Sequence, residues 1–291
     1  MATPPSASAG FRLRRLQKPE ELRAVEEVQR EAWGLEEEPP VPVPILRAMQ
    51  DNGGQVLGAF VDIYLAGFSF GFLGWDGSIL YLYSHMTAVR PPYQNHGLGL
   101  RLKEFQREET LRQGVNEIRW TFDPLQSRNA FLNVRRLGGV PVRYLVHYYG
   151  QMGSALNRGM ETDRLLLRWD LNLPRVVERL GGQYPSAMED AARWQRSEAV
   201  LLTEPGDRGL RTPVEVREPS GSDATIEIPF DLEAIREHEP DSVRKWRHAT
   251  RDAFRLCLDL GFGVDDFAVV TQEHERRSVY FLRKAPAPAP V

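Results

Sequence analysis

The sequence has one cysteine, Cys257, among 291 residues, and none of its apolar runs approaches the ~20 residues that a membrane-spanning helix needs. A single cysteine excludes structural disulfides, cysteine-ligated zinc sites and iron–sulfur clusters, and it is typical of a reducing compartment. The first residues, MATPPSASAG, lack the charged and then apolar order of a signal peptide. We therefore expect a cytoplasmic protein that holds no metal.

An excess of charge of one sign is also missing. The chain has 37 lysines plus arginines against 40 aspartates plus glutamates, which gives a net charge of −3. This balance provides no long-range attraction to nucleic acid or to an anionic membrane, so neither is expected as a partner. A charged ligand would have to be bound by a local patch.

The hydrophobic content of 42% and the aromatic content of 10% are typical of a soluble globular protein, and the length suits two domains. The pattern of strands and helices restarts after a polar, glycine-containing stretch that we place between residues 172 and 195. We expect a monomer or homodimer whose chain divides into a disordered leader (1–10), a first domain (11–172), a second domain (195–284) and a disordered tail (285–291).

The first domain is predicted to be of the α/β class, with a mixed, mostly antiparallel sheet flanked by helices. Its central part reads as an antiparallel meander with an Asp76-Gly77 hairpin turn. The expected strands are 11–17, 55–64, 65–75, 78–89, 117–122, 140–149 and 162–171. One helix is expected to begin at Pro19, a second to span 45–49, a third to end near Gly114 and a fourth to span 130–137. The third helix makes a strand–helix–strand crossover.

The second domain is predicted to be smaller and of the α+β class. Its expected strands are 199–203, 212–217, 224–229, 264–270 and 278–283. A helix is expected over 241–260, with Gly261 as its stop. Strand–helix–strand occurs in both halves of the chain, but no repeat of short period is present.

A glycine-containing segment lies between the strand 78–89 and the helix that follows, and it reads Val89-Arg90-Pro91-Pro92-Tyr93-Gln94-Asn95-His96-Gly97-Leu98-Gly99. Gly97 and Gly99 allow the backbone to approach a ligand closely, and the helix N-terminus offers unpaired N–H groups and the positive end of its dipole. The segment therefore predicts a phosphate or pyrophosphate site. A phosphate loop would need a glycine-lysine-serine/threonine ending, and a dinucleotide fingerprint would need glycine at Leu102.

This segment resembles the GNAT superfamily of acyl-coenzyme A-dependent N-acyltransferases, of the two-domain bacterial type. Gln94, Gly97 and Gly99 match the family's Gln/Arg-x-x-Gly-x-Gly/Ala motif. The resemblance covers residues 11–171 in the order of elements and is sharpest over 80–138, and it makes the second domain a candidate for a degenerate copy of the first. It implies a sheet splayed between its fourth and fifth strands, with acetyl-CoA or another acyl-CoA bound as co-substrate by Met86, Thr87, Ala88, Val89, Gln94, Asn95, His96, Gly97, Leu98, Gly99 and Leu100.

The helix 130–137 looks like the family's second coenzyme segment. Ala130, Leu137 and Gly138 match it directly. Asn133 and Arg136 lie three residues apart on one helical face, so the resemblance assigns them to the pantetheine amides and a phosphate. The arginines of this helix could equally be solvated surface residues.

Acyl transfer to an amine needs a base and is helped by an acid that protonates the thiolate. The two-residue period of a strand places Tyr81, Tyr83, His85, Thr87 and Val89 on one face. We nominate His85 as the base, acting directly or through water, with Tyr83 as runner-up; the alternative is a hydrogen-bonded core histidine.

The acid is less well defined. Many relatives have a tyrosine where this chain has Val134. Either Tyr144, Tyr148 or Tyr149 of the next strand takes that role, or water does, or transfer is not catalysed. Tyrosines in strands commonly serve packing.

Arginines recur along the helix 241–260 at spacings of three, four and four: Arg244, Arg247, Arg251 and Arg255. Such a stripe is commonly a solvated face paired with acidic residues. The functional alternative is that Arg251 binds a carboxylate of the acceptor or the acyl group. Cys257 lies among apolar neighbours and is expected in the core, which gives no support to a covalent acyl-enzyme.

The sequence thus predicts an N-acyltransferase that moves an acetyl or other short acyl group, succinyl among the candidates, to the amine of a small molecule or amino acid in a ternary complex. The alternative is a non-catalytic module that binds or senses acyl-CoA.

Overall fold

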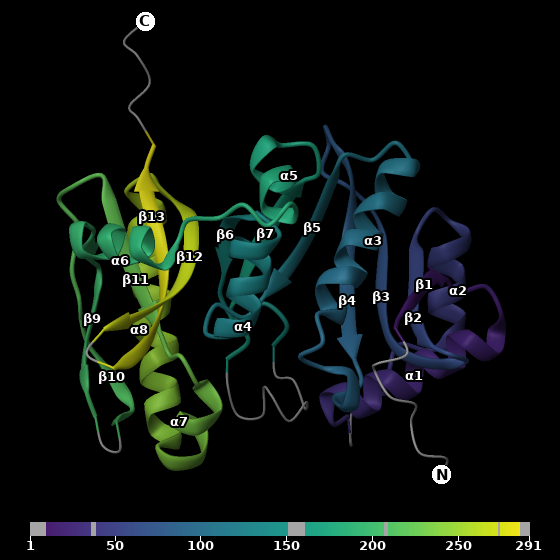
Figure 1. The fold of residues 1–291 in the computed structure, drawn as a ribbon, viewed down its shortest axis with the longest axis horizontal. Coiled ribbons are helices and arrows are strands. Elements are labelled where there is room, and N and C mark those ends of the chain that lie inside the picture. The colour runs from purple at the N-terminus through teal and green to yellow at the C-terminus, as the bar shows by residue number, and fades with distance from the viewer. Residues whose placement is uncertain (1–9, 36–38, 151–160, 207–208, 273, 286–291) are drawn as a thin grey trace, which may run out of the picture. The chain divides into compact units, whose positions relative to one another are not determined.

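The computed structural model describes residues 10–35, 39–150, 161–206, 209–272 and 274–285 (Figure 1). Within these ranges the chain forms two compact units. The first unit comprises the described residues up to Trp120 together with Trp169–Leu173, and the second comprises 121–150, 161–168 and 174–285. The predicted disordered ends lie outside the described residues, apart from Gly10 and Ala285.

The sheet of the first unit contains the predicted meander. Its strands follow one another in the order β1 (Arg12–Arg15), β2 (Gln55–Val61), β3 (Tyr64–Trp75), β4 (Leu80–Val89) and β5 (Glu117–Phe122). Neighbours from β1 to β4 are antiparallel, whereas β4 and β5 are parallel. The parallel pair is joined by α3 (Leu98–Arg112), which confirms the strand–helix–strand crossover and the mixed sheet.

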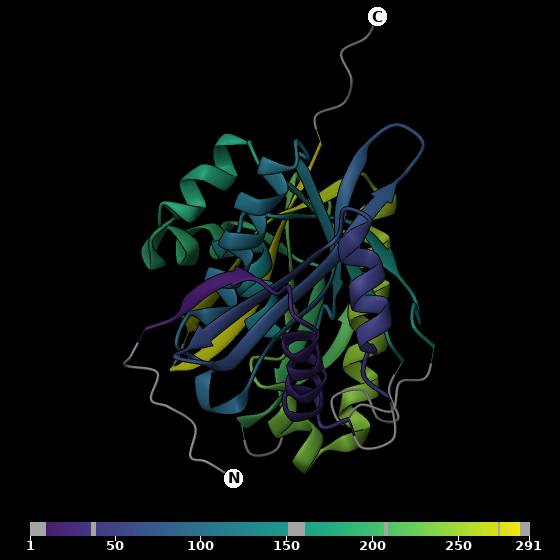
Figure 2. The same ribbon diagram turned by 90° about the vertical axis from the view of Figure 1, so that its right-hand side faces the viewer.

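Helices cover both faces of this sheet. The helices α1 (Pro19–Trp33) and α2 (Val43–Asp51) pack on one face, where Leu22, Val25 and Val28 join a buried cluster with Phe68 and Phe70. Figure 2 shows these two helices in front of the strands. The opposite face is covered by α3, whose Leu98 and Leu102 pack with buried residues of β2. Leu22, Val25 and Val28 follow one another at intervals of three residues, which places them on one face of α1 as its buried stripe.

The second unit combines several short helices with its own sheet. It contains α4 (Ser127–Ala130), the π-helical segment η3 (Phe131–Arg136), and the antiparallel strands β6 (Val140–Leu145) and β7 (Arg164–Asp170). Its four-stranded sheet has the order β12-β13-β11-β8, and β9 pairs with β10. The bounds are β8 (Glu198–Ala199), β9 (Leu201–Pro205), β10 (Arg211–Val216), β11 (Asp223–Ile228), β12 (Phe262–Gln272) and β13 (Glu275–Lys284).

The long helix of this unit, α8 (Pro240–Asp259), was expected from its periodicity, and it buries Trp246, Phe254 and Cys257. Three shorter helices were not predicted: α5 (Pro174–Leu180), α6 (Ala187–Arg196) and α7 (Leu232–His238). Each is shorter than the window in which a helical period becomes distinct. None of the described helices is both long and apolar enough to cross a membrane.

The two compact units divide the chain earlier than the boundary expected between residues 172 and 195. The reason is that η3 and β6 pack against β12, and β6 also contacts α8. A buried ion pair also joins these elements, because Arg135 of η3 binds Asp266 of β12 at 2.8 Å. Sequence alone gives no sign of such pairs, since their members are far apart along the chain.

Candidate functional site

The helix α3 begins at Leu98, directly after the glycine-containing loop. Gly97 precedes the helix with φ of 74°, in the left-handed region that favours glycine. No side chain caps the helix, and its first turn contains no acidic residue. The backbone N–H groups of Leu98, Gly99 and Leu100 belong to the first turn, which has no partners within the helix. The helix therefore begins where the sequence predicted, and the binding of an anion at the positive end of its dipole stays a prediction.

Side chains of the preceding loop hold its shape. Gln94 Nε2 donates to the carbonyl of Val89 at 2.9 Å, and His96 Nδ1 lies 2.8 Å from the carbonyl of Gln94. Asn95 adopts a φ of 65°, and Tyr93 is buried with its ring edge-on to Phe11. Gln94 and His96 thus shape the loop through their side chains, whereas the binding role that the resemblance gave them stays a prediction.

Arg90 supports the same loop, and sequence reasoning assigned it no role. Its side chain is buried, and Nε donates to the carbonyl of Leu65 at 2.8 Å. Its guanidinium binds Glu31 of α1 and lies 3.3 Å from Glu27. The sequence signal for this role was the position of Arg90 directly before two prolines. Prolines cannot donate backbone hydrogen bonds, so side chains have to hold the chain there.

The parallel strands β4 and β5 pair only at their beginnings. Leu82 is opposite Ile118, and Tyr83 is opposite Arg119, and no further pair joins the two strands in the described part of the chain. Along its other edge β4 pairs with β3 as far as Val89. The edge of β4 that faces β5 is therefore left without strand partners from Ser84 onward, which agrees with the splayed sheet that the resemblance implied.

A bulge in β4 corrects the predicted face of this strand. Gly71 of β3 is opposite Ser84 and Phe70 is opposite Met86, so His85 is an extra residue in the ladder. Tyr83 and His85 contact Phe72 on the face of α1 and α2. Beyond the bulge, Thr87 Oγ1 lies 3.1 Å from Ser69 Oγ, and Val89 packs with the cluster under α3. The prediction that all five odd-numbered residues share one face is thus wrong beyond His85.

His85 lies among aromatic rings. Its ring centroid is 5.9 Å from those of Phe70 and Phe72 and 6.3 Å from that of Tyr83. Burial lowers the pKa of His85, so the imidazole is neutral at pH 7. A neutral imidazole has a lone pair that can accept a proton, which is the property that a base requires.

The residues predicted for the second coenzyme segment lie in the second unit. Asn133 is buried in the π-helical segment η3, and Arg136 lies with its guanidinium 5.6 Å from the ring centroid of Tyr184. Arg135 is also buried, and it binds Asp190 at 2.7 Å, so it is not the solvated residue that was one expectation. Val134, which stands where relatives have a tyrosine, is fully buried.

Arg251 and Tyr144 share one carboxylate. Arg251 binds Asp163 with two hydrogen bonds of 2.8 Å, and Tyr144 Oη donates to the same carboxylate at 2.8 Å. Burial, and then the charge of Asp163, raise the pKa of Tyr144. The guanidinium of Arg251 therefore already binds a carboxylate of this chain. The geometry therefore gives Arg251 and Tyr144 a structural contact and does not support the acceptor-binding role of Arg251.

Half of the arginine stripe on α8 is a solvated face, because Arg244 and Arg255 are exposed, whereas Arg247 and Arg251 are not. Arg247 is 2% exposed and binds both oxygens of Asp123, at 2.8 and 2.7 Å. Arg244 does lie at the surface, paired with Asp241. Cys257 is buried as predicted, and burial raises the pKa of its thiol to about 12, which leaves it unreactive at neutral pH.

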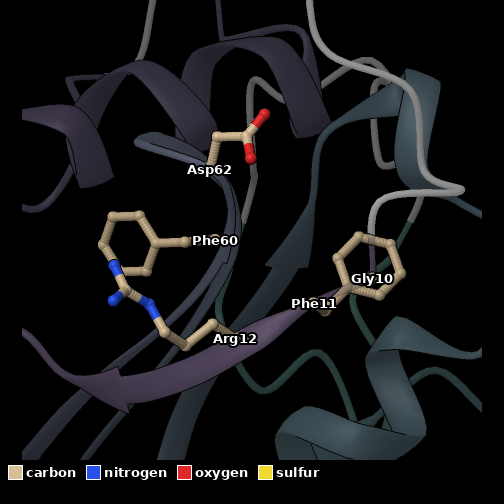
Figure 3. A pocket seen from close by; sticks show the side chains of 5 residues that line it. All are labelled: Gly10, Phe11, Arg12, Phe60 and Asp62. Atoms are coloured by element: carbon tan, nitrogen blue, oxygen red, sulfur yellow. The ribbon is translucent and has the colours of Figure 1, made fainter.

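A pocket opens in the first unit at the start of β1 and the end of β2. Gly10, Phe11, Arg12, Phe60 and Asp62 line it, with Arg12 beside Phe60 and Phe11 apart from them (Figure 3). None of these residues was predicted to bind a ligand. None of the lining residues belongs to the glycine-containing loop, although Phe11 packs edge-on to Tyr93 of that loop.

Comparison with known proteins finds similarity only among solved structures. No protein-family model and no curated protein matches the chain. The ribosomal-protein-S18-alanine N-acetyltransferase of Escherichia coli is 17% identical, with a TM-score of 0.46 over 56% of this chain and 96% of that one. An N-acetyltransferase of Staphylococcus aureus Mu50 is 13% identical, with a TM-score of 0.45 over 56% and 99%.

A third similar structure is Naa50 of Arabidopsis thaliana in complex with the bisubstrate analogue CoA-Ac-MVNAL. It is 14% identical, with a TM-score of 0.43 over 54% of this chain and 97% of that one. At these values, function has to be inferred from the site of the chain itself.

Proposed function

We propose that this chain is an acyl-CoA-dependent N-acyltransferase, a member of the family that its motif resembles. It moves an acetyl or other short acyl group to the amine of a small molecule or an amino acid. The observation that carries the proposal is the fork between β4 and β5, which pair no further than Tyr83 and Arg119. The free edge beyond it can pair with the amides of pantetheine as an added strand does.

The loop after β4 supports the same proposal. The strand that offers its free edge at Met86–Val89 leads directly to Gly97 and the uncapped N-terminus of α3. A helix N-terminus of this kind stabilises a pyrophosphate through backbone N–H groups and the dipole. The two parts of one coenzyme, an amide-bearing arm and a pyrophosphate, thus match two consecutive features of one segment.

The chemistry is direct attack in a ternary complex. The amine nitrogen attacks the thioester carbonyl, the carbon–sulfur bond breaks, and the thiolate leaves and takes up a proton from water. Neutral His85 accepts a proton from the ammonium of the acceptor, directly or through water, and so releases the free amine that attacks. A backbone N–H of β4 stabilises the negative charge that develops on the carbonyl oxygen. The chain contains one cysteine, which is buried, so the proposal includes no covalent intermediate.

The test is a matrix of acetyl-CoA and succinyl-CoA against small amines and both enantiomers of amino acids, with free thiol as the readout. We expect thiol release that depends on both the acyl-CoA and one class of amine. Reactions without amine measure hydrolysis and are subtracted. No amine-dependent release across the matrix, with acyl-CoA bound, would contradict catalysis.

The second candidate is a module that binds or senses acyl-CoA without turnover. It is favoured by Val134, which is fully buried and cannot protonate a thiolate, and by Tyr144, whose hydroxyl is bound to Asp163. Tight binding measured by calorimetry, together with no thiol release, would select this candidate over the enzyme.

A further inference from the structure

Lys103 of α3 is a buried amine next to the fork of β4 and β5. Its side chain is 4% exposed, although lysine is rarely buried without an acidic partner. The chain has only four lysines, Lys18, Lys103, Lys245 and Lys284. Elsewhere its cations are mostly arginines, so lysine at this one buried position calls for a reason.

The contacts of Lys103 join the two strands at the point where they separate. Nζ donates to Ser84 Oγ of β4 at 2.8 Å and lies 3.7 Å from the ring centroid of Trp120 of β5. The register pairs Leu82 with Ile118 and Tyr83 with Arg119, so Ser84 and Trp120 would form the next pair. Ser84 and Trp120 do not pair, and the ammonium of Lys103 contacts both residues.

We propose that Lys103 is a positioning residue that keeps β4 and β5 apart, with its ammonium placed between the side chains of Ser84 and Trp120. A hydrogen bond on one side and a cation–π contact on the other fix the separation of the strands. Gln106 Oε1 accepts a further hydrogen bond at 3.1 Å and holds the amine in place. An effect of Lys103 on coenzyme binding rests on the proposed function. Its effect on the separation of β4 and β5 does not.

The surroundings of the amine make its charge sensitive to pH. Burial lowers the pKa of Lys103 to about 7. Ser84, Gln106 and Trp120, which contact it, are uncharged.

Charged groups of the adjoining elements have other partners or lie on the other face. On α3, Glu109 binds Arg15 and Arg112, and Arg107 donates to the carbonyl of Leu171. On the strands, Arg119 binds Glu117, and His85 lies among rings on the opposite face.

Protonation of Lys103 and coenzyme binding are therefore expected to be linked. The ammonium makes both contacts that separate the strands, whereas a neutral amine attracts the ring of Trp120 only weakly. Coenzyme affinity should fall as pH rises through the pKa of Lys103, by about tenfold, which is within the usual range of coupling between sites. Bound CoA should in turn raise that pKa, because linkage is reciprocal.

The test compares Lys103→Met, which keeps the length of the side chain, with Lys245→Met at an exposed position. Hydrogen exchange by mass spectrometry follows the peptides of β4 and β5 without coenzyme. Loss of a separating group lets the strands pair, so exchange in β4 should become slower in Lys103→Met and stay unchanged in Lys245→Met. Faster exchange of β4 in Lys103→Met would show that Lys103 only stabilises the fold. Unchanged exchange would show that Lys103 does not keep the strands apart. Either result overturns the proposal.

Calorimetry then measures CoA affinity from pH 6.5 to 9. We expect a pH dependence in the wild type and in Lys245→Met that is absent from Lys103→Met. The same pH dependence in all three proteins would overturn the link to the coenzyme. No CoA binding by any of them contradicts the proposed function, while the exchange result still decides whether Lys103 holds the fork.

Discussion

The guanidinium of Arg247 meets the carboxylate of Asp123 through two nearly equal hydrogen bonds, of 2.8 and 2.7 Å, although 124 positions separate the two residues. Asp123 follows β5 directly, and Arg247 lies in the middle of α8. The pair therefore connects the segment after β5 to α8, the long helix of the second unit.

Removing one member of this pair should destabilise the protein strongly. Asp123→Ala leaves the buried charge of Arg247 without this partner, which costs about 3–5 kcal/mol. Arg247→Ala should cost somewhat less, because Arg164 also lies 3.8 Å from Asp123. Urea unfolding followed by circular dichroism measures the loss. Arg244→Ala, on the exposed part of the same helix, should change stability by less than about 0.5 kcal/mol and serves as the control. Equal effects of Arg247→Ala and Arg244→Ala would contradict the geometry of the pair.

Gly97 offers a matched test of the coenzyme site. Gly97→Val puts a β-branched residue at a φ of 74°, and we expect a loss of stability of at least about 1–2 kcal/mol and a coenzyme affinity at least tenfold lower. Gly114, at the other end of α3, has a φ of 75° and equally open space. Gly114→Val should thus cause a similar loss of stability and leave CoA affinity unchanged in calorimetry. If both variants bind CoA like the wild type, the loop does not hold the coenzyme.

Replacing His85 should affect turnover and not coenzyme binding. Loss of a general base typically lowers the rate by roughly 10²- to 10⁴-fold, and we expect His85→Gln to lower kcat to that extent. Full activity of this variant would exclude His85 as the base.

The pH profile gives an independent check on His85. Because burial lowers its pKa, the base form persists below the usual value near 6.5. The wild-type kcat should remain constant through neutral pH and fall only as the pH drops through that lowered pKa. The residual activity of His85→Gln should lack this decline, and a decline that survives the substitution would belong to another group.

Asp163 should make stability depend on pH. Burial raises the pKa of this carboxyl, but hydrogen bonds from Arg251, the His147 amide and Tyr144 outweigh burial, and the pKa lies below its ordinary value. A lowered pKa in the folded state contributes stability above the unfolded value near 4, and this contribution is lost as pH falls through the folded pKa. We expect Asp163→Asn to reduce the difference in unfolding free energy between pH 7 and pH 3.

The exposed pair of Asp241 and Arg244 provides the control for that measurement. Asp241→Asn should leave the pH dependence almost as it is in the wild type, because exposed ion pairs contribute little.

In the same series, Arg251→Ala should lower stability and leave the KM of the acceptor unchanged. A raised acceptor KM with unchanged stability would instead restore Arg251 as a substrate ligand.

Much of the first unit could be predicted because its signals are local. The helical spacing of Leu22, Val25 and Val28 depends only on period, and the strand expected over 117–122 is β5 as observed. Gly97 could be singled out because a left-handed residue before a helix favours glycine whatever the rest of the fold is. The sequence by itself thus determined the order of elements around the crossover and the loop that opens α3.

Tertiary structure alone decided what the individual side chains contact. The bulge at His85 follows from pairing with β3, so a strict period of two could not place Thr87 and Val89 correctly. The spacing of Arg247 and Arg251 indicated a stripe, but the carboxylates that bind them come from positions 124 and 88 residues away. No feature of the sequence marks Lys103 as buried. The packing of α3 on β4 and β5 buries it, because burial depends on neighbours that are distant in the chain.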